Sequence, residues 1–134
     1  AAVLQTLEPD NPVLTSLLSG DRDQFLAREA AARAQAGMPP FAQLAAVILS
    51  APREDKLHEA MRLLAACRPE FANVDCFGPA LAPLAYLRGR HRARFLLRAD
   101  KTVDLQSILR GWVGAVKLPA QVWLHIDVDP YSFL

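Results

Sequence analysis

The hydrophobic residues from Phe41 onward change their spacing in a fixed order, and this order constrains the fold more than any other feature of the sequence. The nearly continuous apolar run over residues 41–51 predicts a strand buried on both faces. The elements expected after it are a helix over residues 52–68, a strand over 74–78 that runs into a proline-rich segment, a strand over 88–100, a helix over 105–116 and a strand over 121–128.

This β-α-β-β-α-β order predicts an α+β fold of the ferredoxin-like type. In such a sandwich four antiparallel strands form a sheet and two helices cover one face. Trp112 lies on the apolar stripe of the helix over 105–116, so we expect it in the core.

Residues 1–37 differ in composition from residues 38–134, and we expect a boundary at the Met38-Pro39-Pro40 break. The opening residues predict the end of a strand, followed by a short helix that stops at Gly20. Asp21 is expected to cap a second helix, with Gly37 just beyond its end. Because this second helix has few apolar residues to bury, residues 1–37 are predicted to be a helical connector that packs on a neighbouring domain.

The composition excludes several classes of protein. Hydrophobic residues make up 52% and charged residues 22%, which is not typical of disorder, and the net charge of +1 gives no strong overall field. The longest apolar run, over residues 44–49, is far shorter than the roughly 18 residues of a membrane span. The first residues carry no positive charge and so do not resemble an export signal. Cys67 and Cys76 lie in apolar surroundings and are expected to be buried, reduced thiols of a cytoplasmic protein.

The sequence shows no catalytic constellation. It lacks the phosphate-loop, dinucleotide, nucleophile-elbow and zinc-protease motifs, and its histidines are far apart, so we expect neither a catalytic site nor a metal site. Asp127 and Asp129 are the one pair of nearby carboxylates in a strand. They could bind a cation or share a proton, or they could end the strand by meeting an arginine or backbone amides.

Positive charge is concentrated in residues 88–101. Strand alternation places Arg92, Arg94 and Arg98 on one face, with Arg88 and Arg90 beside them at the turn. Their spacing matches the roughly 6–7 Å repeat of a phosphate backbone, so one hypothesis is contact with nucleic acid without sequence readout. The other is a solvated hairpin balanced by acidic residues elsewhere.

Trp123 and His125 are expected on the sheet face opposite the core stripe of the last strand. A tryptophan there could stack a base, as strand aromatics do in some nucleic-acid-binding modules, or it could pack against another domain.

Four segments, in the right order, resemble the C-terminal region of the primosomal replication-restart DNA helicases, the PriA or primosomal protein N′ family. They are VLQTLEPDNPVL, DRDQFLAREAAARAQAGMPPF, GPALAPLAYLRGRHRARFLLRAD and IDVDPYSFL. The resemblance implies that residues 1–37 end the preceding helicase lobe. It also implies a bacterial, cytoplasmic parent that is an ATP-dependent 3′–5′ helicase, whose nucleotide, magnesium and zinc sites lie upstream. This chain would then hydrolyse no ATP and hold no cofactor.

The resemblance further implies partners and site residues. The implied partners are forked or branched DNA, single-stranded-DNA-binding protein, other primosome proteins and the rest of the helicase. The family's G-R-x-R hairpin corresponds to Gly89, Arg90 and Arg92, so these two arginines are the first choice for DNA contacts, supported by Arg88, Arg94 and Arg98. Gln106, Lys101 and Trp123 are the candidates for partner contacts. The family's basic residue before Gln106 is replaced by Thr102, and Leu81 replaces a usual proline.

Two hypotheses follow. The first is a non-catalytic DNA- and partner-binding domain that acts in the restart of stalled replication forks. The second is a structural interaction domain that docks on the helicase lobes or on single-stranded-DNA-binding protein without touching DNA.

Overall fold

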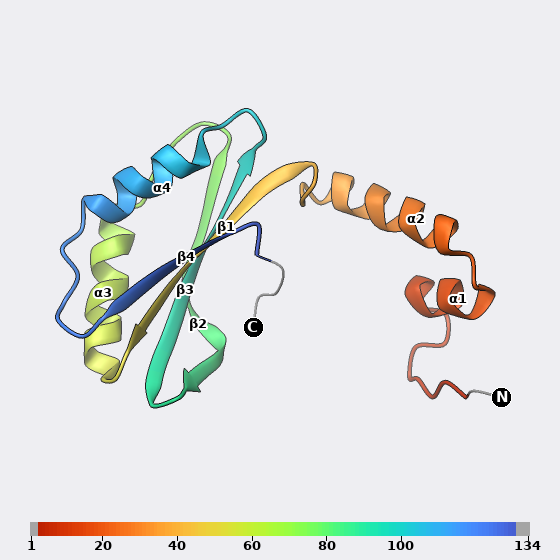
Figure 1. The fold of residues 1–134 in the computed structure, drawn as a ribbon, viewed down its shortest axis with the longest axis horizontal. Helices are drawn as coiled ribbons and strands as arrows, with labels where there is room; N and C mark the ends of the chain where they lie inside the picture. Colours follow the sequence, from red (N-terminus) through yellow and green to blue (C-terminus); the bar gives the residue numbers. More distant parts are fainter. Residues whose placement is uncertain (1–2, 131–134) are drawn as a thin grey trace. The chain divides into compact units, whose positions relative to one another are not determined.

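The computed structural model describes residues 3–130, and the chain forms two compact units, residues 1–37 and residues 38–134 (Figure 1). The final YSFL of the sequence, which belongs to the last segment of the family resemblance, lies outside the described residues, as do Ala1 and Ala2. None of the helices within residues 3–130 has the length and apolar character needed to span a bilayer.

The first unit is a pair of helices, α1 (Pro12–Ser19) and α2 (Arg22–Gln35). Asn11 caps α1 by accepting a hydrogen bond from the Val13 amide, and Asp21 caps α2, as predicted, by accepting one from the Gln24 amide at 2.9 Å. The strand predicted at the start of the chain is wrong for residues 3–11, which contain no strand. Without a neighbouring sheet within the unit, this short segment has no strand to pair with.

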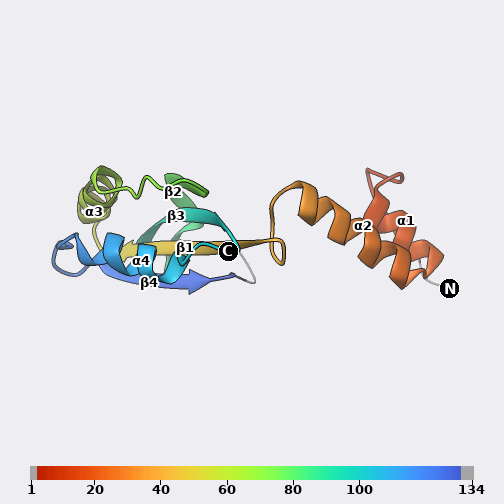
Figure 2. The same cartoon turned by 90° about the horizontal axis from the view of Figure 1, so that it is seen from above.

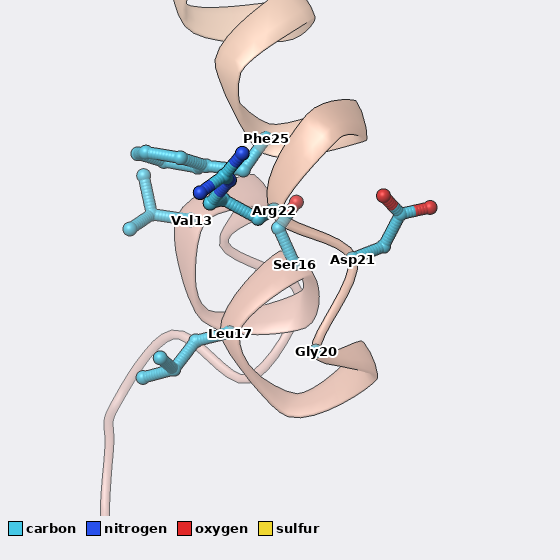
Figure 3. Close-up of a pocket in the computed structure, with 7 residues that line it drawn as sticks. All are labelled: Val13, Ser16, Leu17, Gly20, Asp21, Arg22 and Phe25. Carbon is cyan, nitrogen blue, oxygen red and sulfur yellow. The ribbon is translucent and has the colours of Figure 1, made fainter.

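Little of this helix pair is buried. Among its described residues only Ser16 is buried, while Leu17 is 65% and Leu18 71% exposed. Val13 on α1 and Phe25 on α2 lie on the same side of the pair and help to line a hollow of about 260 Å³ (Figure 3). A unit with so small an apolar core gains little stability from its own packing.

The second unit is a four-stranded antiparallel sheet with two helices, so the predicted α+β class is confirmed. Its elements are β1 (Ala42–Ala51), α3 (Glu54–Ala66), β2 (Val74–Leu87), β3 (Arg90–Asp100), α4 (Leu105–Gly114) and β4 (Trp123–Val128). The strand order is β2-β3-β1-β4, which Figure 2 shows from one edge of the sheet to the other. This order is consistent with the ferredoxin-like arrangement expected from the sequence.

Both helices pack on one face of the sheet (Figure 1). Alternate residues of the central strands meet the apolar sides of α3 and α4 there. The core they form contains Val47, Leu49, Leu57, Leu64, Phe95, Leu97, Leu105, Leu109 and Trp112. Trp112 is 4% exposed, stacks edge-on against Phe95 and donates from Nε1 to the Leu64 carbonyl at 3.0 Å, so its predicted core role is confirmed.

Several element ends differ from their predicted positions. α3 begins at Glu54 after Arg53, rather than at Pro52, and ends at Ala66. β4 begins at Trp123 because Gln121 has a left-handed backbone with φ of 68°. β2 continues to Leu87 through two irregular points, which lets the proline-rich segment stay in the sheet at its edge.

Gly78 lies at the first irregular point of β2, between Phe77 and Ala80. Its φ is +104°, and a Cβ built there would lie 2.9 Å from the Arg94 carbonyl oxygen and 3.3 Å from the Phe95 Cα. These are backbone atoms of a central strand, so they cannot move aside cheaply. Only glycine fits this close approach of β2 to β3.

We therefore predict that Gly78→Ala lowers the free energy of unfolding by about 1–3 kcal/mol, since it combines a disfavoured backbone angle with a backbone contact. Chemical denaturation of the chain measures this. Gly111→Ala is the matched control, because Gly111 lies in α4 with open space around it, and it should be neutral or stabilising by up to about 1 kcal/mol. Equal effects of the two variants would contradict the prediction.

Candidate nucleic-acid interface

The sheet face without helices carries its side chains in rows that the strand register sets. Ser50 of β1 pairs with Arg92 of β3 and with Trp123 of β4, so these three residues form one row. The next row is Arg94, Ile48 and His125. Successive rows are two residues apart along each strand, which is about 7 Å.

The β2–β3 hairpin places two more arginines beside these rows. Arg88 and Gly89 form its two-residue turn with positive φ angles of 51° and 77°, the backbone that a tight hairpin turn requires. Arg88 is exposed at the tip, and Arg90 begins β3 on the same face as Arg92. The structure thus brings together the following residues, which we call the basic end of the sheet: Arg88, Arg90, Arg92, Arg94, Trp123 and His125.

Arg90 is held by contacts with three other residues. Its Nε donates to the Ser50 Oγ at 3.1 Å, and its Nη2 donates to the carbonyl oxygens of Ser50 and Gln121, each at 2.8 Å. The guanidinium carbon lies 3.6 Å from the centre of the Trp123 ring. The Arg90 side chain therefore forms hydrogen bonds with β1 and with the segment before β4, and it stacks on the first residue of β4.

The other arginines of the basic end are differently placed. Arg92 and Arg94 are half-buried, and Arg92 makes no hydrogen bond or ion pair with residues 3–130. A hollow of about 340 Å³ opens at this end, lined by Arg88, Arg92, Trp123 and His125 among others. Its lining holds three arginines and no carboxylate, so it favours a negatively charged ligand.

The opposite end of the same face is acidic. Arg98 donates to the Asp75 carboxylate, at 2.7 Å from Nη2, and its guanidinium lies 5.8 Å from the Phe77 ring centre. Asp100 ends β3 beyond this pair, and Asp127 lies in the row between the two ends. Arg98 is therefore paired with Asp75, and the row that contains Asp127 lies between it and the other predicted arginines.

The three predicted partner residues do not lie together. Trp123 is in the row of Ser50, whereas Lys101 directly follows Asp100, which pairs with Ala42 at the other end of β1. Eight residues of strand separate these rows, which is about 27 Å. Gln106 is exposed in the first turn of α4, near Lys101 in the chain.

The N-terminus of α4 also carries a negative group. Asp104 caps the helix by accepting hydrogen bonds from the Ser107 hydroxyl at 2.7 Å and the Ser107 amide at 3.1 Å, and these bonds lower the pKa of Asp104. The carboxylate is thus ionised at neutral pH close to Gln106. It opposes the binding of an acidic peptide there, and Arg110 of the same helix is the basic residue whose charge acts on it.

For Asp129, the structure shows the second of the two readings of the paired carboxylates, the one in which the carboxylate meets backbone amides. Asp129 accepts a hydrogen bond from the Leu44 amide at 3.0 Å and its own amide donates to the Leu44 carbonyl at 2.7 Å, so it ends β4 by binding backbone. Within residues 3–130 no group of three or more potential ligands is placed to hold a metal ion.

The expectation that both cysteines are buried is wrong. Cys67 is exposed because it follows the end of α3, while Cys76 is half-buried against the core and burial raises the pKa of its thiol. Sequence reasoning also missed Ser50 and Gln121, which bind Arg90. A lone serine at the end of an apolar strand was the only signal, and nothing in the sequence marked the Gln121 carbonyl.

Taken together, the fold and the basic end define an α+β domain whose sheet leaves one face uncovered and presents arginines and an exposed tryptophan at one corner of that face. Residues 34–131 match the model of the family described as the primosomal protein N C-terminal domain, and the chain belongs to this family. The family resemblance inferred from the sequence is thereby confirmed.

Known relatives agree with this assignment. The chain is 42% identical over 130 residues to the replication restart protein PriA of Rickettsia felis, covering 97% of this chain and 20% of the relative. It is 31% identical over 136 residues to that of Treponema pallidum, again covering 20% of the relative. For the protein of Haemophilus influenzae the identity is 31% over 131 residues, 18% of its length. The chain therefore spans about a fifth of the curated relatives it matches.

Arg90 offers a first prediction for this site. Arg90→Lys keeps the charge but cannot form the same forked set of hydrogen bonds or stack as a plane on Trp123, so we expect a loss of about 1–2 kcal/mol in the free energy of unfolding. Chemical denaturation measures it. Arg92→Lys, on the same strand and face, should change stability by less than about 0.5 kcal/mol. Indistinguishable denaturation midpoints for the two variants would show that the Arg90 contacts add no stability.

A second prediction for this unit concerns Asp104 and the pH dependence of the free energy of unfolding. Its pKa is lower when folded than unfolded, so its stabilising contribution is present above the ordinary carboxyl pKa and is lost as the pH falls through the folded value. Asp104→Asn keeps an uncharged cap at every pH. Thermal unfolding between neutral and strongly acidic pH should show the native chain losing stability relative to this variant in the acid range. A constant difference across the range would rule out this contribution.

Proposed function

We propose that this chain is a non-catalytic DNA-binding domain of a replication-restart protein, and that it contacts DNA through the basic end of its open sheet face. The proposal rests on one observation: Arg88, Arg90 and Arg92 line the hollow at the basic end of the sheet, and no carboxylate lies in that lining. Rows about 7 Å apart suit successive phosphates of a nucleic-acid backbone. Such contacts give affinity without sequence readout, which suits a protein that must act on any fork.

The contacts proposed here differ in role from those expected from the sequence. Arg88 and Arg92 are proposed as the main phosphate ligands, with Arg94 beside them. Arg90, fastened by three hydrogen bonds, would position Trp123 and add charge. Arg98 would contribute least, because Asp75 already neutralises it.

The wider role is proposed from the relatives, which are replication restart proteins. The parent protein would be a cytoplasmic ATP-dependent helicase that acts on forked DNA with other primosome proteins and single-stranded-DNA-binding protein. Its nucleotide and metal sites would lie outside this chain, which would bind DNA without ATP, magnesium or zinc of its own.

A second candidate, docking on another protein without DNA contact, is favoured by one observation. The edge strand β2 exposes large apolar side chains, among them Leu81 at 53% and Tyr86 at 61%. Such a strip is typical of a surface that packs against a neighbour. Leu81 and Tyr86 pair with Ala93 and His91, which alternate with Arg92 and Arg94 along β3, so the two functions can be tested by separate substitutions.

The test is fluorescence anisotropy with a labelled forked DNA over a series of salt concentrations. Phosphate contacts predict that the logarithm of the association constant falls linearly with the logarithm of the salt concentration, by about 0.9 for each phosphate neutralised on duplex. The double variant Arg88→Ala/Arg92→Ala should bind more weakly and reduce the magnitude of this slope by about 2.

The matched control is Arg62→Ala/Arg110→Ala, which removes the same charge from exposed positions on α3 and α4. It should bind like the native chain. Equal loss in both double variants would mean that only net charge matters, and a native chain that binds no DNA at low salt would favour the docking function.

A further inference from the structure

The exposed ring of Trp123 is the feature of the basic end that phosphate binding leaves unexplained. The residue is 65% exposed, although the Arg90 guanidinium lies 3.6 Å from the ring centre. An aromatic ring has two faces, and Arg90 covers one of them. The large exposed fraction therefore belongs to the second face and the edges, where the ring meets solvent.

This ring is held ready for a ligand. Three hydrogen bonds fix Arg90, and the fixed guanidinium plane in turn limits the orientations that the indole can adopt. A ligand that stacks on the open face would pay little for ordering the tryptophan, because the fold has already ordered it. The serine and the carbonyl oxygens that hold Arg90 belong to β1 and the segment before β4, so the arrangement is built on rigid elements.

The surroundings define the chemistry of that ligand. The hollow of about 340 Å³ next to the ring lies at the lower end of the range of about 300–1,000 Å³ for small-molecule sites. Ile48 contributes an apolar side chain to it, and Arg88 and Arg92 contribute positive charge. Trp123, Ser50 and Arg92 share one row. The indole ring, on which a base could stack, and Arg92, which could bind a phosphate, are therefore two strands apart, or about 10 Å.

We infer that Trp123 stacks the base of an unpaired nucleotide whose flanking phosphates are bound by Arg88 and Arg92. This inference rests on the proposed function and makes it more specific. In a continuous duplex the faces of the bases are covered by their neighbours, so an indole can stack only on a base that has left the helix or lies in a single strand. The basic end would thus select single-stranded arms and frayed ends over intact duplex.

An acidic peptide is the other ligand that could satisfy the arginines. Its carboxylates would leave the open indole face in contact with water, whereas a nucleotide covers the ring and neutralises the arginines together. The nucleotide is therefore the occupant that uses the whole site, and the peptide becomes an outcome of the experiment.

The experiment separates the base from its phosphate. The 134-residue chain is titrated against a fluorescent duplex of about 20 base pairs that carries a single-stranded arm of about six thymidines, and against the same duplex with an abasic arm of equal length. Both arms have the same phosphates, so their difference in affinity measures base stacking alone. The native chain should bind the thymidine arm about 5-fold more tightly or better.

The variants assign that difference to the ring. Trp123→Ala should bring the ratio of the two affinities to about 1 and leave the salt slope on the abasic arm unchanged, while Trp123→Phe should keep part of the preference. The double variant Arg88→Ala/Arg92→Ala should weaken binding of both the thymidine-arm and the abasic-arm duplex and leave the ratio of the two affinities unchanged. Trp112 is the other tryptophan in the chain and is buried, so quenching of tryptophan emission by the thymidine arm should disappear in Trp123→Phe.

Four outcomes would overturn the inference. A native chain that binds the abasic-arm duplex with the expected salt slope but shows no preference for thymidine over abasic sugar would leave DNA binding intact and exclude base stacking. An unchanged preference in Trp123→Ala would place the base elsewhere. Hexaglutamate that quenches Trp123 and displaces the arm would assign the hollow to an acidic peptide. A chain that binds none of these DNAs would overturn the proposed function as well.

Discussion

The antiparallel register between β1 and β3 determines what each face of the sheet can do. It runs from Ala42 paired with Asp100 to Ala51 paired with His91. In this register Phe95 and Leu97 meet the helices, and Arg92 and Arg94 lie on the open face. A shift of one residue would bury guanidinium groups under α3 and α4, at a cost of several kcal/mol for each charge. The positive charge of the open face is therefore a direct consequence of how the apolar core packs.

The arginines of β3 have similar sequence surroundings but different physical roles. Arg90 lies where β3 extends one residue past the end of β1, and its side chain reaches the Ser50 and Gln121 carbonyl oxygens. Arg98 lies opposite Asp75 on β2 and is neutralised there. Arg92 has neither kind of partner among residues 3–130. Depending on its row, an arginine of β3 thus holds neighbouring strands together (Arg90), forms an ion pair (Arg98) or is available to bind an anion (Arg92).

The sequence predicted the features that depend on periodicity and missed those that depend on contacts between distant residues. The alternation of β3 and β4 and the helical spacing around Trp112 were enough to place each residue on its face. The Arg98–Asp75 pair and the Arg90 clamp involve strands whose pairing the sequence does not state. Gly78 could not be singled out either, because its constraint comes from the Arg94 carbonyl oxygen of the next strand. The wrong expectation for Cys67 has a similar origin, since its exposure follows from where α3 ends.

The separation of charge along the open face also limits what this chain can bind alone. The whole chain carries a net charge of only +1, and Asp75, Asp100 and Asp127 occupy the rows beyond Arg94. A phosphate backbone that entered at the basic end would meet these carboxylates within two or three rows, about 14–20 Å. The favourable footprint is therefore a few phosphates long, and counterion release from so few contacts gives a modest affinity. The DNA contact proposed above would therefore suit a local feature, such as the end of an arm, and a longer binding site would need contacts outside the basic end.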